Sequence, residues 1–246
     1  MADWRVALER DARNRLTQTR REAMTHGSLL IGAARSLLAA LALLACSTAV
    51  VQAQVYEFGR ILAGGAGGTD PEKRRIVSGM GAYMCLDVSP GMTAGGSAVK
   101  LTIWSKIPQP NSRVRNIAID LGRHANLLAN LSVTLQSPGV KAKFGAAQPH
   151  AFLPGLKPTY WLDIPGPGGI APGGLIILTA TLGSGKTHAD VLNAIHEGMS
   201  AATANNGLRL GLVVNSLLGG PPPGVTTISD DGGFVVSGVG RVCQQR

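Results

Sequence analysis

The sequence has few aromatic and few charged residues. Phe, Trp and Tyr make up 4% of its 246 residues, and Asp, Glu, Lys and Arg make up 15%, whereas about 25% is the usual charged share of a soluble domain. The low charge argues against a coiled coil, whose outer positions are charged. The apolar share of 45% argues against a disordered tail, which lacks material for a core. Glycine and proline number 33 and 14, which is typical of a chain with many turns.

The sequence also lacks a convincing catalytic constellation. His196-Glu197 begins a zinc-protease pattern, but Ser200 stands where the second histidine is required. Gly183-Ser184-Gly185 lacks the spacing of a nucleophile elbow. The carboxylates are scattered along the chain. We therefore expect no catalytic residues, no metal site, no cofactor and a non-enzymatic role.

Positive charge is in excess, but it is not concentrated. The formal net charge is +9, and the longest basic run is Lys73-Arg74-Arg75. A nucleic-acid-binding chain would gather Lys and Arg on one face, with aromatic residues nearby for single strands. We therefore expect no specific nucleic-acid partner and interpret the charge as an aid to solubility.

The N-terminal region has the pattern of an export signal. Residues 28–53 carry one charge, Arg35, and include the apolar run Leu37 to Ala45. An apolar run of this length behind basic residues is typical of a signal peptide, and Val51-Gln52-Ala53 has small residues where a signal peptidase cuts. We predict that residues 1–53 are an N-terminal extension and signal peptide. The protein is then exported to the periplasm, the outer surface or the medium.

Two other interpretations of this region stay open. Leu43-Leu44-Ala45-Cys46 resembles the lipobox of bacterial lipoproteins, which implies cleavage before Cys46 and acylation of its thiol. Because about 20 apolar residues span a bilayer, residues 28–53 are also long enough for an uncleaved membrane anchor. In every case, the N-terminal segment is the only expected membrane contact.

Export changes the interpretation of the cysteines. Removal of residues 1–53 leaves Cys85 and Cys243, and an even pair in an oxidising compartment favours a disulfide. The bond would close a loop of about 158 residues, which the loop-entropy description values at up to about 4–5 kcal/mol. The alternative is a pair of free buried thiols.

Beyond the signal, the pattern is mostly that of short strands. Residues 54–75 have the composition of a flexible linker. From residue 76 onward, runs such as Val99-Lys100-Leu101-Thr102-Ile103 alternate polar and apolar residues, as half-buried antiparallel strands do. Glycine and proline separate these runs. We predict strands at 98–104, 113–120, 127–135, 140–144, 159–164, 175–181, 208–214, 225–228 and 234–242.

These strands predict a mainly β domain over residues 76–246, an antiparallel β-sandwich, with an α+β fold as the alternative. One packed amphipathic helix is expected near residues 187–204. Thr187-His188-Ala189-Asp190 resembles a capping box, and Val191 and Ile195 begin an apolar stripe at helical spacing.

One motif raises the possibility of nucleotide binding. Ala180 to Thr187 matches the relaxed P-loop pattern, with an apolar strand before it and the expected helix after it. Gly185, Lys186 and Thr187 are therefore candidate nucleotide-binding residues, with the lysine on the phosphates and the threonine on Mg²⁺. However, no later apolar run ends in an aspartate to serve the metal, and export removes the segment from the cytoplasm. A glycine turn before a capped helix is the simpler interpretation.

The C-terminal third resembles a known structural module. The residues concerned are Thr187, Ala189-Asp190-Val191, Ala194-Ile195, Asn206-Gly207 and Val225 to Phe234. Together, residues 174–242 resemble a β-α-β module of flagellins and phage tail proteins. The resemblance implies a glycine-led helix followed by a hairpin, in a structural role without catalytic residues.

A second resemblance concerns the first strands of the domain. Cys85-Leu86-Asp87-Val88, with Trp104 downstream, is similar to one repeat of a ricin-type lectin. It implies sugar binding by the aspartate and a later aromatic residue. A β-trefoil needs three such repeats. The sequence has one, and it lacks the closing Gln-x-Trp.

Taken together, the sequence favours an exported bacterial protein with a structural, adhesion or surface-assembly role. The expected partners are proteins, including copies of itself, or cell-surface glycans. Lectin-like carbohydrate binding and nucleotide binding through residues 180–187 are the alternatives.

Overall fold

The fold is given by a computed structural model, which describes residues 53–64, 79–147, 149–165, 169–200, 206–215, 232–240 and 243. These residues belong to a compact unit that runs from Val51 to Arg246. The predicted signal segment, apart from Ala53, lies outside the described residues, as do Cys46 and the strand predicted at 225–228. No helix among the described residues is long and apolar enough to cross a bilayer.

The described strands form two six-stranded sheets. The first sheet has the order β12 (Gly238–Val239), β1 (Gln54–Glu57), β3 (Met84–Thr93), β4 (Gly96–Ser105), β9 (Leu175–Leu182), β6 (Leu128–Gln136). The second has the order β2 (Arg60–Gly64), β11 (Gly232–Val235), β10 (Arg209–Asn215), β5 (Arg113–Asp120), β8 (Tyr160–Asp163), β7 (Lys143–Gly145). All these neighbours pair antiparallel. The predicted fold class, mainly antiparallel β with one packed helix, is confirmed.

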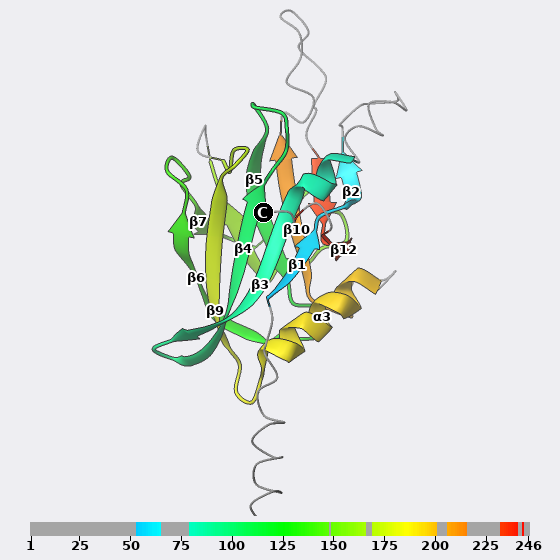
Figure 1. Ribbon diagram of the computed structural model, residues 1–246. Coiled ribbons are helices and arrows are strands. Elements are labelled where there is room, and N and C mark those ends of the chain that lie inside the picture. The colour runs from blue at the N-terminus through cyan, green and yellow to red at the C-terminus, as the bar shows by residue number, and fades with distance from the viewer. Residues whose placement is uncertain are drawn as a thin grey trace, which may run out of the picture. The chain divides into compact units, whose positions relative to one another are not determined.

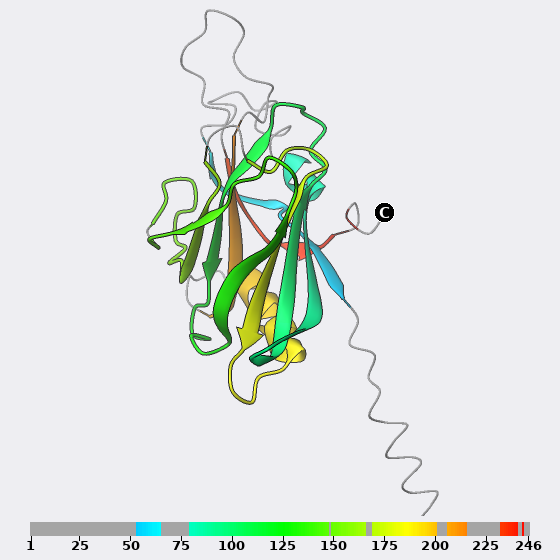
Figure 2. The ribbon, with the colours of Figure 1, turned by 90° about the vertical axis from the view of Figure 1, so that its left-hand side faces the viewer.

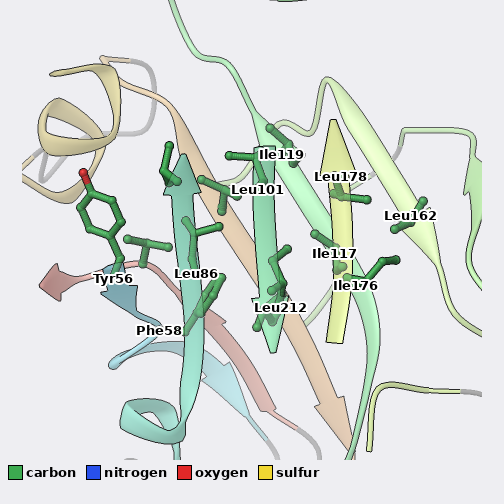
Figure 3. Close-up of a cluster of buried hydrophobic side chains, with 14 of the residues drawn as sticks. Tyr56, Phe58, Leu86, Leu101, Ile117, Ile119, Leu162, Ile176, Leu178 and Leu212 are labelled. Atoms are coloured by element: carbon green, nitrogen blue, oxygen red, sulfur yellow. The ribbon is translucent and has the colours of Figure 1, made fainter. Parts of the chain in front are cut away.

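The two sheets pack face to face around one core (Figures 1 and 2). Because side chains alternate between the faces of a strand, the long strands β3, β4, β5, β9 and β10 each give alternate residues to this core. Figure 3 shows the resulting layer of fully buried aliphatic side chains, among them Leu86, Leu101 and Leu178 from the first sheet and Ile117, Leu162 and Leu212 from the second. Burial of each such side chain contributes about 1.5–3 kcal/mol.

The helix α3 (His188–Ser200) lies beside one end of the sandwich (Figure 1). Its buried face includes Val191 and Ile195, which are the residues of the predicted apolar stripe. A Cβ on Gly198 would overlap the carbonyl oxygen of Leu208, and the Leu208 N–H donates to the Ala194 oxygen at 2.8 Å. The glycine thus lets the helix approach the chain that enters β10. The prediction of a helix near 187–204 is confirmed over residues 188–200.

On one side of the sandwich, two chain segments pass together from one sheet into the other and so join the two sheets. β1 and β2 follow each other but belong to different sheets, and β11 and β12 do the same. β1 pairs with β12 and β2 pairs with β11, so the two segments cross together from one sheet to the other. Phe58 is fully buried at the crossing. On the other side, the described edges of the two sheets are β6 and β7.

This closure differs from the sequence-based expectation. Residues 54–75 were expected as a flexible linker, but residues 54–57 and 60–64 are strands of the two sheets. The predicted strand 234–242 is likewise two short strands, β11 and β12, in different sheets. Single short segments give a weak alternation signal, and their strand state depends on partners far away in the sequence.

The strand β3 was not among the predicted strands. Its centre, Ser89-Pro90-Gly91, has the composition of a turn. In the structure Pro90 pairs with Val99 of β4, while the described pairing with β1 ends at Val88. Among the described strands, β3 therefore has a partner on one side only at Pro90, which is where a strand tolerates a residue without an N–H donor.

Candidate functional site

Cys85 and Cys243 are joined by a disulfide, with their Cα atoms 5.7 Å apart, and they are 158 positions apart in the sequence. Cys85 lies in β3 directly opposite Trp104 of β4. Trp104 and the two half-cystines form a small apolar cluster, and Val55 and Leu175 pack against it. The bond that the sequence predicts is therefore present. The bond ties the chain just after β12 to β3 of the first sheet.

The P-loop-like residues lie in a turn between β9 and α3. β9 pairs antiparallel with both β4 and β6, whereas the strand before a P-loop belongs to a parallel sheet covered by helices. A Cβ on Gly183 would overlap the backbone oxygen of Asn126, and Gly185 has a φ of +70°. Both glycines are thus accounted for by backbone packing and turn geometry.

Thr187 and Asp190 form the predicted capping box. The Thr187 N–H and hydroxyl both donate to Asp190 Oδ2, at 2.7 and 2.9 Å, and the Asp190 N–H donates back to Thr187 Oγ1 at 3.3 Å. These hydrogen bonds lower the pKa of Asp190. A phosphate or Mg²⁺ would need the same threonine groups, which the cap already uses. Lys186 is exposed beside them.

The lectin-like residues form the hairpin of β3 and β4. Asp87 lies opposite Thr102, and Cys85 lies opposite Trp104. Trp104 is 9% exposed and packs on the disulfide. The aromatic residue of this resemblance therefore has a packing role in the structure.

An open pocket of about 270 Å³ lies on the second sheet, where β5, β8 and β7 are neighbours. Lys143 of β7 and Asn116 of β5 are each paired in register with Asp163 of β8, so the three residues lie in a row across the sheet. The described residues that line it are Arg115, Asn116, Lys143, Asp163, Ile164 and Pro165. We call this the outer pocket.

A β-bulge brings two consecutive residues into the outer pocket. Asn116 is paired with Val213 of β10, and Val114 is paired with Val214, so Arg115 is an extra residue in β5. A bulge interrupts the alternation of side chains, which explains why Arg115 and Asn116 both line the pocket. The Arg115 oxygen accepts the Ile164 N–H at 2.8 Å and so holds the pocket rim.

The carboxylate of Asp163 is fixed by two donors. Its Oδ1 accepts from Asn116 Nδ2 at 2.8 Å and from Trp161 Nε1 at 2.7 Å. Hydrogen bonds to a charged acceptor are stronger than neutral ones, so this oxygen is well positioned. Trp161 is itself buried.

His150 covers Trp161 from the loop between β7 and β8. The two rings are stacked, with centroids 5.4 Å apart and planes at 24°. The His150 Nδ1 accepts the Phe152 N–H at 3.2 Å. Burial lowers the pKa of His150, and the charge of Asp163 offsets part of that change. The imidazole is therefore neutral near pH 7.

The same loop packs on the second sheet and forms a second, smaller core. Leu153 and Leu156 are buried against Ala118 and Val213. A Cβ on Gly233 would overlap the carbonyl oxygen of Phe152, so this glycine lets the loop lie directly on β11. This loop therefore lies directly on the second sheet.

A second polar cluster lies along α3. Glu197 accepts from Arg123 Nη2 and His124 Nε2, both at 2.9 Å, and these contacts, led by the one with His124, lower the pKa of Glu197. The Tyr56 hydroxyl points toward α3 (Figure 3) and lies 3.5 Å from His196 Nε2. Burial raises the pKa of Tyr56 to about 12. Both contacts join the helix to the body of the sandwich.

Sequence reasoning did not identify the outer pocket. Its described residues lie up to 50 positions apart in the sequence, from Arg115 to Pro165, and they meet because of strand register and a bulge, which no local pattern encodes. One signal was available: Trp161 and Asp163 are two apart in a strand, so they share a face. Among the described residues, His, Cys, Asp and Glu side chains form no group of three that could hold a metal ion.

The chain was compared with protein-family models, curated proteins and solved structures, and it matches none of them.

Proposed function

We propose that this chain is an exported, non-enzymatic protein of the bacterial cell surface or periplasm, with an adhesion or surface-assembly role. The observation that carries the proposal is the Cys85–Cys243 disulfide. Disulfides persist in oxidising compartments outside the cytoplasm, and the N-terminal sequence has the pattern of an export signal.

The contacts of three hydrogen-bonded carboxylates support a structural role. The Asp120–Arg209 ion pair joins β5 to β10, Glu197 joins α3 to the loop before β6, and Asp163 joins β5 to β8. Each of these carboxylates accepts hydrogen bonds that hold elements together. A rigid scaffold of this kind suits a protein whose task is to present a surface.

The surface also carries apolar side chains suited to protein contacts. Met92 at the β3–β4 hairpin is 76% exposed, Leu135 of β6 is 55% exposed and Phe144 of β7 is 43% exposed. Leu135 and Phe144 belong to β6 and β7, the described edge strands on one side of the sandwich, and backbone groups at a sheet edge can pair with a further strand. Assembly with another protein or with a second copy is therefore proposed to use this side of the sandwich.

Mass spectrometry of the protein purified from its own cells tests the export part. A mature chain beginning at Gln54, with a mass increase of two hydrogens on reduction, is the expected result. An acylated Cys46 would also indicate export, through the lipoprotein route. An intact cytoplasmic chain with two free thiols at Cys85 and Cys243 would overturn the proposal.

Surface labelling tests the role. A membrane-impermeant amine reagent should label Lys143 or Lys141 on intact cells or, for a periplasmic protein, after the outer membrane is opened. Phe144→Ser should reduce self-association or partner binding, and Tyr83→Ser, at a residue that is 37% exposed elsewhere on the fold, is the matched control. Equal binding by wild type and the Phe144 variant would contradict the proposal that assembly uses the β6 and β7 side of the sandwich.

A further inference from the structure

We propose that the N-terminus of the mature chain modifies itself: Gln54 closes to a cyclic pyroglutamate with the help of His196. The α-amino nitrogen of Gln54 is the nucleophile, and the amide nitrogen of its own side chain leaves as ammonia. The inference deepens the proposed function and rests on it in one respect, because cleavage after Ala53 is what frees the amine.

Gln54 is the first residue of the predicted mature chain and also the first residue of β1. It pairs in register with Val88 of β3. Ala53, on the other side of the predicted cut, is exposed and belongs to no strand. Cleavage between the two residues therefore removes no part of the described sheets, and it places the new amine at the end of a paired strand.

The side-chain amide of Gln54 lies against His196 of α3. The Gln54 Nε2 is 3.4 Å from the His196 Nε2, although the two residues are 142 positions apart in the sequence. An amide nitrogen is a donor only, so it donates this hydrogen bond and the imidazole nitrogen accepts it. The imidazole thus presents a lone pair to the nitrogen that leaves when the ring closes.

Tyr56 makes a second contact with the same imidazole. It is two residues from Gln54 in β1, so the two side chains share a face of the strand. The Tyr56 hydroxyl lies 3.5 Å from His196 Nε2, and the two rings meet edge to face with centroids 5.8 Å apart. The imidazole therefore lies beside the start of β1, in contact with two residues of that strand.

Ring closure requires a proton to pass from one nitrogen to another. The amine attacks Cδ of the Gln54 side chain, the Cδ–Nε2 bond breaks, and ammonia departs. In the intermediate both nitrogens are bonded to the same carbon, so one imidazole reaches both. His196 takes the proton from the attacking nitrogen as a general base and returns it to the leaving nitrogen as a general acid. No other reactant is consumed.

The conditions at the site suit this reaction. A free α-amino group has a pKa of about 7.7–8.0, so part of it is unprotonated and nucleophilic near neutral pH. His196 is exposed, which lets ammonia leave to water. The product has no free amine, which is the group that aminopeptidases bind, so the exported chain gains a protected N-terminus. The chain reacts once with itself and turns over no other substrate.

The rate of ring closure in the released chain tests the inference. A protease site placed directly before Gln54 allows residues 1–53 to be removed in vitro, and mass spectrometry of the N-terminal peptide follows the loss of one ammonia. Because general acid–base catalysis contributes roughly 10²–10⁴-fold, the folded chain should close at least about tenfold faster than the same chain in urea at the same pH. A Gln54 amine that persists, or an equal rate in urea, would overturn the inference.

Two histidine variants locate the catalytic group. His196→Gln should lower the rate in the folded chain about tenfold or more, to the rate of the unfolded chain. His150→Gln is the matched control, because His150 contacts Phe152 and Trp161 in another part of the fold, and it should leave the rate unchanged. Equal rates in wild type and the His196 variant would overturn the role of the imidazole. Circular dichroism and the urea midpoint confirm that each variant is folded.

The outcome is separable from the proposed function, because release in vitro does not depend on export. A chain that closes the ring after release but stays intact in its own cells would overturn the export proposal and leave the chemistry of Gln54 in place. A chain that is cut after Ala53 in its own cells but keeps a free Gln54 amine would do the reverse.

Discussion

Arg209 lies directly opposite Asp120 where β10 pairs with β5, and its guanidinium donates to the Asp120 carboxylate. Their side chains are 14% and 3% exposed. The same carboxylate accepts the Lys157 N–H at 3.0 Å, and Arg209 also donates to the Gly155 oxygen at 2.6 Å. One ion pair thus joins two strands and holds the loop that covers the second sheet.

Asp120→Asn is expected to lower the free energy of unfolding by about 3–5 kcal/mol, because it removes one charge of a buried ion pair and replaces the charged acceptor of Arg209 and of the Lys157 N–H by a neutral amide. Urea denaturation with the disulfide intact measures the loss. Asp190→Asn, which changes an exposed helix cap, is the matched control and should cost clearly less. If the two variants lose equal stability, the ion pair does not have the role described.

Loss of the disulfide is expected to reduce stability by about 2–5 kcal/mol. The double variant Cys85→Ser with Cys243→Ser should therefore unfold at a lower urea concentration than wild type. Cys46→Ser leaves the disulfide in place and should unfold at the same urea concentration as wild type. Wild type treated with a reductant should behave like the double variant, and a reductant effect on the double variant itself would point to another cause.

Gly183→Ala is expected to cost about 1–3 kcal/mol, because a Cβ there overlaps the backbone oxygen of Asn126 and the neighbouring chain has to move. Ser184→Ala, at the exposed next residue, should change the unfolding free energy by less than about 0.5 kcal/mol. Thermal unfolding of the two variants gives the comparison. If Gly183→Ala has the same unfolding free energy as wild type, the turn is less tightly packed than the structure shows.

MgATP is expected not to bind up to millimolar concentration, because the Thr187 N–H and hydroxyl are used by the helix cap. Equilibrium dialysis with the full chain measures this directly. Lys186→Ala should leave the urea midpoint unchanged, since the lysine is exposed. Saturable MgATP binding that disappears in the Lys186 variant would restore the nucleotide interpretation.

Stability should fall at high pH because of Tyr56. The phenol has a pKa of about 12 in the folded state and about 10 when unfolded, so the folded state keeps its proton to higher pH. The contribution is complete below pH 10 and is lost as the pH rises towards 12. Tyr56→Phe should remove this part of the fall in unfolding free energy, while Tyr83→Phe, at a partly exposed tyrosine, should retain it. A wild-type phenol that titrates near pH 10 would contradict the burial effect.

The sequence was sufficient to predict the strands whose signal is local. β4 alternates apolar and polar residues, β5 and β9 contain short apolar runs, and glycine or proline turns flank all three. Their predicted bounds agree with the structure within two residues. The capping box at Thr187 and the pairing of Cys85 with Cys243 were also predictable. In each case, the decisive interaction is either close in sequence or limited to one available partner.

The features that depend on distant partners were not predictable in this way. β1 and β2 are strands because β12 and β11 pair with them from the other end of the chain. The outer pocket depends on the register that places Asn116 and Lys143 beside Asp163, and on the bulge at Arg115. A single sequence does not show how strands pair in register, so it does not predict that these residues lie together.

The position of the disulfide also determines how the protein responds to a pulling force. If the chain is held before β1 and pulled beyond Cys243, tension passes directly from Cys85 to Cys243, and the 158-residue span between them carries none. The stretch from Gln54 to Cys85 can then extend to about 110 Å at most. Without the bond, the same pull could draw the chain from Gln54 to Cys243 out to roughly 650 Å. A single covalent bond thus limits the reach of a tethered copy to about one sixth and keeps most of its strands unloaded.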